Sequence, residues 1–262
     1  MIIKIQKPNN ISKLELKQIA QQLKINNYAI YDIGSGLSVD QSKNFIQKLA
    51  SFFSLKNIDS NLCADSDSIS SITVNQSKSR YIPYSSKAIN WHTDGYYNSD
   101  NQQIKCFILH CVQPAAVGGV NRIINHEVIY QYLKQQQPEY LKALMNKNAL
   151  TIPANEIKGR QIRKQQGGAV FSFDQDKKLH MRYSARGKNI IWHKNAQDAA
   201  DFVKNLLDQV NLYQEIKLKS GNGIIANNVL HSRTKFTDQA GAKRHLLRAR
   251  FYQRAILQNS NG

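Results

Sequence analysis

Apolar residues near the N-terminus recur every three or four positions, the period of an amphipathic helix. Ser12 and Glu15 have the spacing of a capping box, so a first helix is expected to begin there. Asp40 is expected to cap a second helix. The apolar positions are Leu16, Ile19, Ala20 and Leu23 in the first helix, and Phe45, Leu49, Phe52 and Phe53 in the second. Each of these helices should bury one face.

Beyond these helices the pattern changes to short apolar or alternating runs between turn residues, which predict β-strands. The exceptions are a helical pair broken by Pro138, which suits the first position of the second helix, and a helix capped at Asn195 that runs to about Val210. The predicted strands are SITV, QQIKCFILHCV, VNRII, GGAVFSF, KLHMRYSA, KNIIWH, YQEIKLK, GIIAN and RHLLRARFY. Many short strands with a few peripheral helices predict a mainly β fold, an antiparallel double sheet or jelly roll.

The length of 262 residues allows a sizeable core, and no Pro- or Gly-rich linker divides the chain, so we expect one domain. The first residues, MIIKIQKPNN, lack the features of a signal peptide, and no apolar run reaches the length of a membrane span. Cys63, Cys106 and Cys111 form no CxxC pair and suit reduced thiols. We therefore expect a cytoplasmic protein without a membrane partner.

The net charge of +18 favours acidic partners, such as small carboxylates, anionic lipids or nucleic acid. The basic residues are spread along the chain, however, without the short dense cluster typical of a nucleic-acid patch. A solvated, Lys-rich surface is the simpler interpretation. A nucleic-acid oxygenase or binding module would rest on charge alone, and we expect no nucleic-acid partner.

The segment His92-Thr93-Asp94 carries the strongest chemical signal, together with His231 far downstream. In an extended segment His92 and Asp94 project to the same side, while Trp91 points toward the core. Two imidazoles and one carboxylate match the facial triad of non-haem Fe(II) oxygenases. The alternative is a hydrogen-bonded surface histidine and a turn aspartate. His110, which falls inside an apolar strand, is expected to be a core histidine instead of a ligand.

The strand RHLLRARFY places basic and apolar residues on opposite faces. Arg244, Arg248 and Arg250 fall on one face with Leu246, and the other face is largely apolar. One face is therefore expected in the core, and the other should line a polar cavity. The planar guanidinium suits bidentate recognition of a carboxylate. An exposed basic strand face is the alternative.

The segments NWHTDGYY, then GG, NNVLHSRTKF and RHLLRAR, in this order, together resemble the taurine dioxygenase-like (TauD/TfdA) superfamily of Fe(II)- and 2-oxoglutarate-dependent oxygenases. The resemblance covers roughly residues 80–254. It implies a double-stranded β-helix, a jelly-roll variant, in a single domain over residues 1–262 with a variable N-terminal part at 1–79. It also implies Fe(II) as cofactor, 2-oxoglutarate and O2 as cosubstrates, and an assembly that is often a homo-oligomer.

The resemblance assigns roles to individual residues. It implies that His92, Asp94 and His231 are the iron ligands, and that Arg244 anchors the distal carboxylate of 2-oxoglutarate. By the same likeness Arg248 meets either the cosubstrate or an anionic substrate group. Asn121 falls where the superfamily usually has Thr or Ser as a second contact to that carboxylate, and its amide can donate the same hydrogen bond.

Five further residues are candidates for substrate binding: Tyr84, Asn90, Tyr96, Arg182 and Arg186. The first two precede the expected ligands closely, and the two arginines share a strand face in HMRYSARGK. The surplus arginines predict a small anionic organic substrate, such as a carboxylate, sulfonate or amino acid, that is hydroxylated with release of succinate and CO2. The alternative function is a non-catalytic jelly roll that binds or senses a small anion or a metal.

Overall fold

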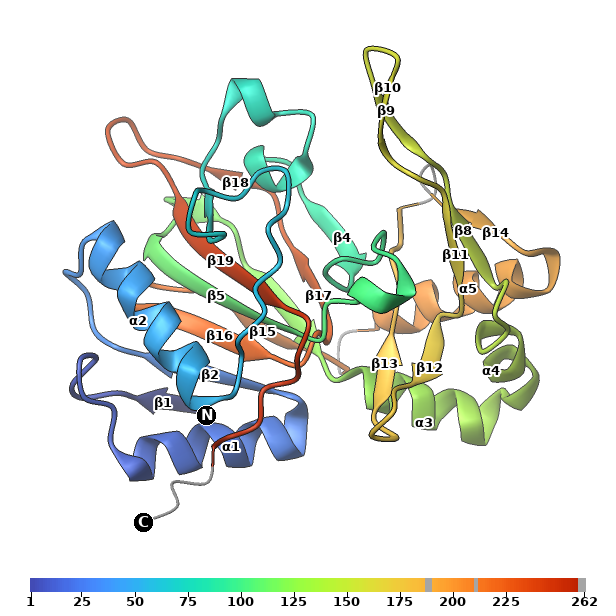
Figure 1. Ribbon diagram of the computed structural model, residues 1–262, viewed down its shortest axis with the longest axis horizontal. Coiled ribbons are helices and arrows are strands. Elements are labelled where there is room, and N and C mark those ends of the chain that lie inside the picture. Colours follow the sequence, from blue (N-terminus) through green and yellow to red (C-terminus); the bar gives the residue numbers. More distant parts are fainter. Residues whose placement is uncertain (187–189, 210–211, 259–262) are drawn as a thin grey trace.

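Two antiparallel sheets packed face to face form the centre of the computed structural model, which describes residues 1–186, 190–209 and 212–258 (Figure 1). The larger sheet has the order β1-β2-β16-β5-β19-β3, with one parallel pair, β1 and β2. Its strands are β1 (Ile2–Lys4), β2 (Tyr28–Asp32), β16 (Asn222–Ala226), β5 (Cys106–Gln113), β19 (His245–Phe251) and β3 (Ser70–Ile72). The smaller sheet has the order β15 (Gln214–Ile216), β7 (Asn121–Ile124), β17 (Leu230–Arg233) and β4 (Ile89–His92).

Strand β5 is buried on both faces, and the alternation of its side chains divides them between two apolar clusters. Cys106 and Ile108 pack on the outer side with two helices, α1 (Lys13–Asn26) and α2 (Val39–Phe52). Phe107 and Cys111 pack on the inner side against residues of the smaller sheet. The larger sheet is thus the middle layer between helices and the second sheet, as the mainly β prediction with peripheral helices requires (Figure 1).

Strand β19 has the two faces that its sequence predicts. Leu247, Ala249 and Phe251 belong to the core beneath the helices, whereas Arg248 and Arg250 line a cavity on the other face. The basic face is therefore internal, and the alternative of an exposed basic strand face is wrong.

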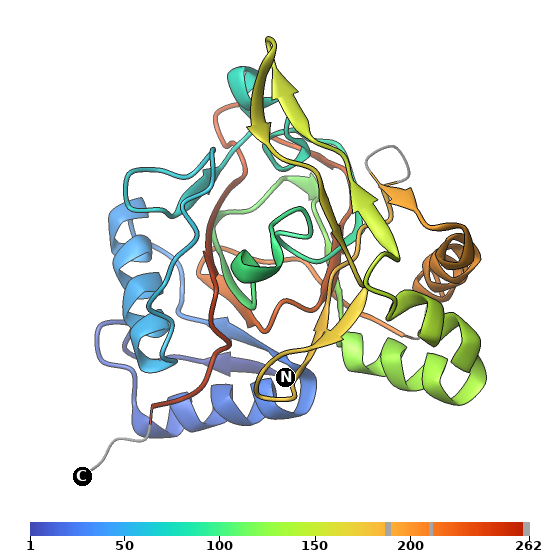
Figure 2. The same cartoon turned by 45° about the vertical axis from the view of Figure 1, so that its right-hand side comes forward.

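The second half of the chain adds a smaller lobe with its own apolar core. Its helices are α3 (His126–Gln136), α4 (Pro138–Leu144) and α5 (Lys194–Leu207). Its strands are β8 (Leu150–Ile152), β11 (Gln166–Gly168), β14 (Ile191–Trp192), β12 (Phe171–Phe173) and β13 (Leu179–Met181). A hairpin of β9 (Asn155–Ile157) and β10 (Arg160–Arg163) projects away from these strands in both views (Figures 1 and 2).

Short elements complete the described chain. A two-stranded pair joins β6 (Val117–Gly118) to β18 (Phe236–Thr237), and three 3-10 helices cover Gln76–Lys78, Ile82–Tyr84 and Asp100–Gln102. Gly118 needs its positive φ of 72°, and a Cβ there would lie 2.2 Å from the carbonyl oxygen of Lys235. Within the described residues, no helix is both long and apolar enough to cross a membrane.

The structure confirms the capping box of Ser12 and Glu15, and Pro138 at the start of α4. It corrects the start of the second helix, which Ser38 caps through a hydroxyl that accepts from the backbone N–H of Gln41. Asp40 instead lies in the first turn, where a carboxylate favours the helix dipole.

Two other predicted boundaries also change. Helix α5 begins at Lys194 after His193, so Asn195 is inside the helix and does not cap it. The predicted end at Val210 lies outside the described residues, as do the first residues of the KNIIWH strand. The run GGAVFSF is divided between β11 and β12, which belong to different sheets.

Candidate metal centre and adjoining cavities

Three side chains predicted to bind a metal meet inside the sandwich. His92 ends β4 and is paired across the sheet with His231 of β17, and the centroids of their rings lie 4.2 Å apart. Asp94 follows two residues after His92 and is buried. One ligand atom from each residue lies within 4.8 Å of the other two. The intervening Thr93 is directed away and hydrogen-bonds to Tyr183.

Backbone contacts orient both imidazoles. Nδ1 of His92 lies 2.9 Å from the carbonyl oxygen of Asn90, and Nδ1 of His231 lies 3.0 Å from that of Val229. A carbonyl can only accept, so each Nδ1 carries the proton and each Nε2 presents a lone pair. This arrangement is typical of metal-binding histidines, whose second nitrogen is held by an outer partner.

The electrostatic surroundings keep all three groups in the protonation state that a metal needs. Burial, together with His231, lowers the pKa of His92 to about 3, and burial also lowers the pKa of His231. Burial alone would raise the pKa of Asp94, but Arg248 and Arg250 hold it well below its usual range. Near neutral pH the cluster therefore offers two neutral imidazoles and one carboxylate.

Asp94 is held by partners that leave one oxygen free. Arg248 donates to Oδ1 at 3.0 Å, and Oδ2 is buried without a hydrogen-bond partner among the described residues. Asn228 accepts from the backbone N–H of Asp94 at 2.7 Å and donates to its carbonyl oxygen at 2.9 Å. The unpaired Oδ2 beside two free Nε2 atoms fits a divalent cation bound by this triad.

Asn228 and Gly95 position the metal centre. Asn228 was not assigned a role from the sequence, whereas a glycine directly after Asp94 suits the tight turn expected there. Asn228 adopts a positive φ of 49°, which asparagine tolerates better than most residues. Gly95 has a φ of 63°, and a Cβ there would meet Ile104 at 2.3 Å. The Asn227-Asn228 pair, three residues before His231, was the available sequence signal for Asn228.

A small cavity of about 40 Å³ beside the triad contains Arg244 and Asn121. Arg244 is only 4% exposed and pairs with no carboxylate in the described chain. Burial lowers its pKa to about 10, so it remains a cation at neutral pH. A buried, unpaired cation is unfavourable unless an anion binds to it. This cavity therefore has the character of a carboxylate site.

Arg233 also lies in this cavity, although the sequence analysis did not give it a role. Its guanidinium and that of Arg244 lie 4.7 and 4.9 Å from the ring centroid of Phe236. Arg233 donates to the carbonyl oxygens of Ser85 and Lys87, and so fixes the segment that leads into β4. Arg233 lies two residues after His231 on the same strand, and this spacing could have predicted that it faces the same cavity.

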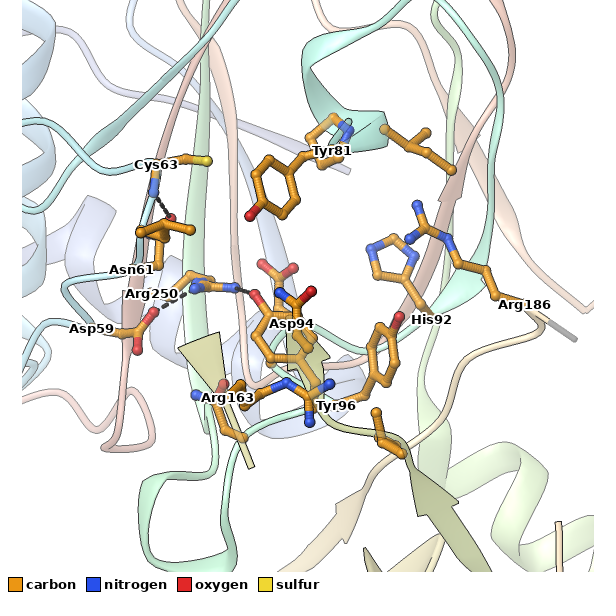
Figure 3. A pocket seen from close by; sticks show the side chains of 18 of the residues that line it. Asp59, Asn61, Cys63, Tyr81, His92, Asp94, Tyr96, Arg163, Arg186 and Arg250 are labelled. Carbon is orange, nitrogen blue, oxygen red and sulfur yellow. Dashed lines mark hydrogen bonds and ion pairs between the residues drawn. The ribbon is translucent and has the colours of Figure 1, made fainter. Parts of the chain in front are cut away.

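A second cavity of about 630 Å³ also adjoins the triad, and His92, Asp94 and Arg248 line both spaces. Figure 3 shows Arg186 next to His92, with Tyr96 also directed into this cavity. Tyr84 lies in the wall and donates to the carbonyl oxygen of Cys63 at 3.3 Å. Three of the five candidate substrate residues thus meet in one cavity.

The structure places Arg182 and Asn90 outside this cavity. Arg182 is buried and donates to the carbonyl oxygens of Tyr96, Asn98 and Gly167, so it supports the loop after the metal ligands. Asn90 is exposed, because an irregular register between β4 and β17 breaks the alternation that would place it beside His92. Neither side chain belongs in the candidate substrate site.

The chain belongs to the family described as taurine catabolism dioxygenase TauD, TfdA, whose model matches residues 34–250. It is similar to a uridine-5′-phosphate dioxygenase of an Amycolatopsis species, with 29% identity over 61% of this chain and 59% of the relative. A uridine-5′-phosphate dioxygenase of a Streptomyces species is 27% identical over 71% of this chain and 69% of the relative. The match to the Amycolatopsis protein thus spans less than two thirds of its length.

Solved structures agree with the fold. An asparagine oxygenase complex with Fe(II), 3-hydroxyasparagine and succinate superposes with a TM-score of 0.66 at 12% identity, covering 93% of this chain and 78% of the other. A taurine dioxygenase-like protein from Burkholderia xenovorans gives 0.63 at 14% identity, covering 96% and 88%. The predicted family and the mainly β fold are confirmed, and the two packed sheets match the predicted jelly roll.

Proposed function

We propose that the chain is an Fe(II)- and 2-oxoglutarate-dependent dioxygenase that hydroxylates a small anionic organic substrate. The observation that carries this proposal is that two cavities of different character adjoin the triad. One contains the buried, unpaired Arg244, and the other is large enough for an organic substrate. Membership of a dioxygenase family supports the same conclusion and disfavours a purely binding or sensing role.

Each residue then has a defined task. His92, Asp94 and His231 hold the cation on one face and leave the other positions open. Arg244 binds the distal carboxylate of 2-oxoglutarate, and Asn121 in the same cavity offers its amide as a second donor. Arg248 fixes Asp94 and faces both cavities. Bound Fe(II) supplies O2 activation coupled to decarboxylation of 2-oxoglutarate to succinate and CO2.

The substrate is a finer part of the proposal. The names of two relatives favour uridine 5′-phosphate, whereas the asparagine oxygenase likeness would favour an amino acid. Both are small and carry an anionic group, a phosphate or a carboxylate, that the arginines of the large cavity can bind. We also propose that residues 1–262 are one domain, because β1, β2 and β3 from the first 79 residues extend the larger sheet. A cytoplasmic location, the absence of a nucleic-acid partner and a homo-oligomer stay predictions.

An anaerobic titration tests the function. Protein with Fe(II) and 2-oxoglutarate should develop a metal-to-ligand charge-transfer band, and admission of O2 with ascorbate should yield succinate. His92→Ala and His231→Ala should each lose Fe(II) binding. An unchanged metal affinity in both variants would contradict the proposed ligand set, and absence of succinate with every substrate tried would favour a non-catalytic role.

A further inference from the structure

The large cavity contains more arginines than its own carboxylates can neutralise. Five arginines line it, against two carboxylates, Asp94 and Asp59. Arg248 pairs with Asp94, and Arg250 pairs with Asp59 while also donating to the hydroxyl of Tyr97. Three positive charges remain, and Arg80, Arg163 and Arg186 carry them. A cavity with this excess concentrates anions and favours their binding.

Two of these three arginines meet at the base of the β9–β10 hairpin. Arg163 is the cross-strand partner of Asn155, whose Oδ1 accepts from Arg80 at 2.9 Å. Cross-strand partners share one face of a hairpin, so the Arg163 side chain leaves the hairpin on the same face as the Asn155 side chain that Arg80 contacts. All three residues line the large cavity, and none lines the small one with Arg244.

Arg163 is held in place but not neutralised. It is half-buried, donates to the carbonyl oxygens of Lys164 and Pro153 at 3.1 and 2.6 Å, and lies 5.8 Å from the ring centroid of Tyr97. A guanidinium has five N–H donors, so these two bonds leave donors for a ligand. No carboxylate pairs with Arg163 or Arg80 among the described residues. A fixed, unpaired guanidinium is well suited to bidentate contact with phosphate.

The same cavity also has apolar walls that inorganic phosphate would not use. Leu62 and Ile162 line it and are 65% and 38% exposed, so part of their apolar surface can contact the organic part of a ligand. The volume of about 630 Å³ exceeds what a single anion fills and lies in the range of ligand-binding clefts. The ligand therefore combines an anionic group with a larger organic body.

We propose that Arg163, with Arg80 and the amide of Asn155 beside it, binds a phosphate monoester on the substrate, in the part of the large cavity that the β9–β10 hairpin lines. This deepens the proposed function, on which it rests. It makes the substrate a phosphorylated molecule of nucleotide size, whose phosphate is held by the hairpin and whose reacting carbon faces His92 and Asp94. Figure 3 shows Arg163 and His92 at different places on the wall of this cavity.

Calorimetry on the metal-free chain of residues 1–262 tests the proposal without any oxygenase chemistry. The probes are two matched pairs, uridine 5′-phosphate with uridine, and ribose 5-phosphate with ribose. In each pair the phosphorylated probe should bind at least tenfold more tightly. Arg163→Gln should remove most of that preference, and Arg80→Gln should reduce it. Arg160→Gln is the matched control, because Arg160 is exposed on the same strand and does not line the cavity.

Two results would overturn the proposal: phosphorylated and unphosphorylated probes that bind equally to the wild-type protein, or a phosphate preference that Arg163→Gln and Arg160→Gln leave equally intact. A variant that loses affinity must keep the wild-type circular dichroism spectrum and thermal midpoint to count as support. If succinate is formed but phosphate binding fails, the oxygenase stands and only the hairpin assignment is wrong. If the phosphate preference is found but Fe(II) does not bind, the hairpin assignment stands and the proposed oxygenase function is wrong.

Discussion

Arg244 and Arg248 lie four residues apart and face the same region, but their surroundings give them different tasks. Arg248 already has a carboxylate partner in Asp94, whereas Arg244 is buried without one. We expect Arg244→Gln to weaken 2-oxoglutarate binding more than tenfold, because the distal carboxylate loses a charge-assisted, bidentate partner. Fe(II) affinity should change less than twofold. Titration of the charge-transfer band measures the first quantity, and Fe(II) equilibrium dialysis the second.

Arg122→Gln is the control for Arg244, since it removes an arginine of the smaller sheet that is half-exposed and paired with Glu215. It should leave both affinities unchanged. Equal weakening of 2-oxoglutarate binding in the two variants would mean that overall charge, not the anchor, is responsible.

Asn228 is a residue whose importance comes from three hydrogen bonds to the backbone around the metal centre. It accepts from the N–H of Asp94 and donates to the carbonyl oxygens of Asp94 and Ile104. Asn228→Ala would leave these buried groups unpaired, and we expect a loss of about 2–3 kcal/mol in the free energy of unfolding. Urea unfolding measures this loss, and Asn98→Ala, an asparagine of the loop after Asp94, should cost less. An Asn228→Ala protein as stable as wild type would contradict the role.

At this scale the structure brings together the three side chains that the sequence motifs select, and their role as metal ligands stays a proposal. His92, Asp94 and His231 could be found because their order and spacing are specific. Asn90 was proposed because it closely precedes the ligands, and Arg182 because alternation was assumed along a segment that leads into a loop, but neither residue lines the large cavity. A β-bulge changes the side of the sheet on which a residue projects, and the sequence of residues 89–92 does not predict the irregular register found there.

At the scale of elements, β19 connects the core to the site, and its two faces can be tested separately. Leu247 is fully buried beneath the helices, so Leu247→Ala should reduce the free energy of unfolding by about 3 kcal/mol through lost burial and a cavity. Chemical denaturation provides the measurement. Val128→Ala, at a position 46% exposed on α3, is the control and should cost under about 1 kcal/mol. Similar losses at the two positions would contradict the layer arrangement.

The same element shows why some strands are predictable and others are not. In β19 basic and apolar residues alternate, so a period of two is visible in the sequence, whereas β5 is buried on both faces and is marked by a continuous apolar run. The β9–β10 hairpin has exposed positions on most of its length, so TIPANEIKGRQIR carries no apolar alternation to reveal it. Its position over the large cavity depends on distant parts of the fold, and only the structure provides it.

At the scale of the whole molecule, three buried histidines outside the metal centre should make the protein sensitive to acid. Burial lowers the pKa of His110 and of His126 to about 4, and that of His180 to about 3. In the unfolded chain each imidazole takes up a proton near pH 6.5. Because the unfolded state then binds more protons, the free energy of unfolding should fall as the pH drops from about 6.5 toward 4, by roughly 1.4 kcal/mol per pH unit for each histidine.

Urea unfolding of the metal-free protein between pH 7.5 and 4.5 measures this slope. The metal is removed because metal binding is itself coupled to proton release from the ligands. His180→Asn should reduce the slope of unfolding free energy against pH by the contribution of one histidine. This reduction is expected whatever the variant's stability at pH 7.5. His193→Asn is the matched control, since His193 is exposed before α5 and should leave the slope unchanged. A flat profile from pH 6.5 to 5 in the wild-type protein would show that these three imidazoles take up protons in the folded state. That result would contradict their burial.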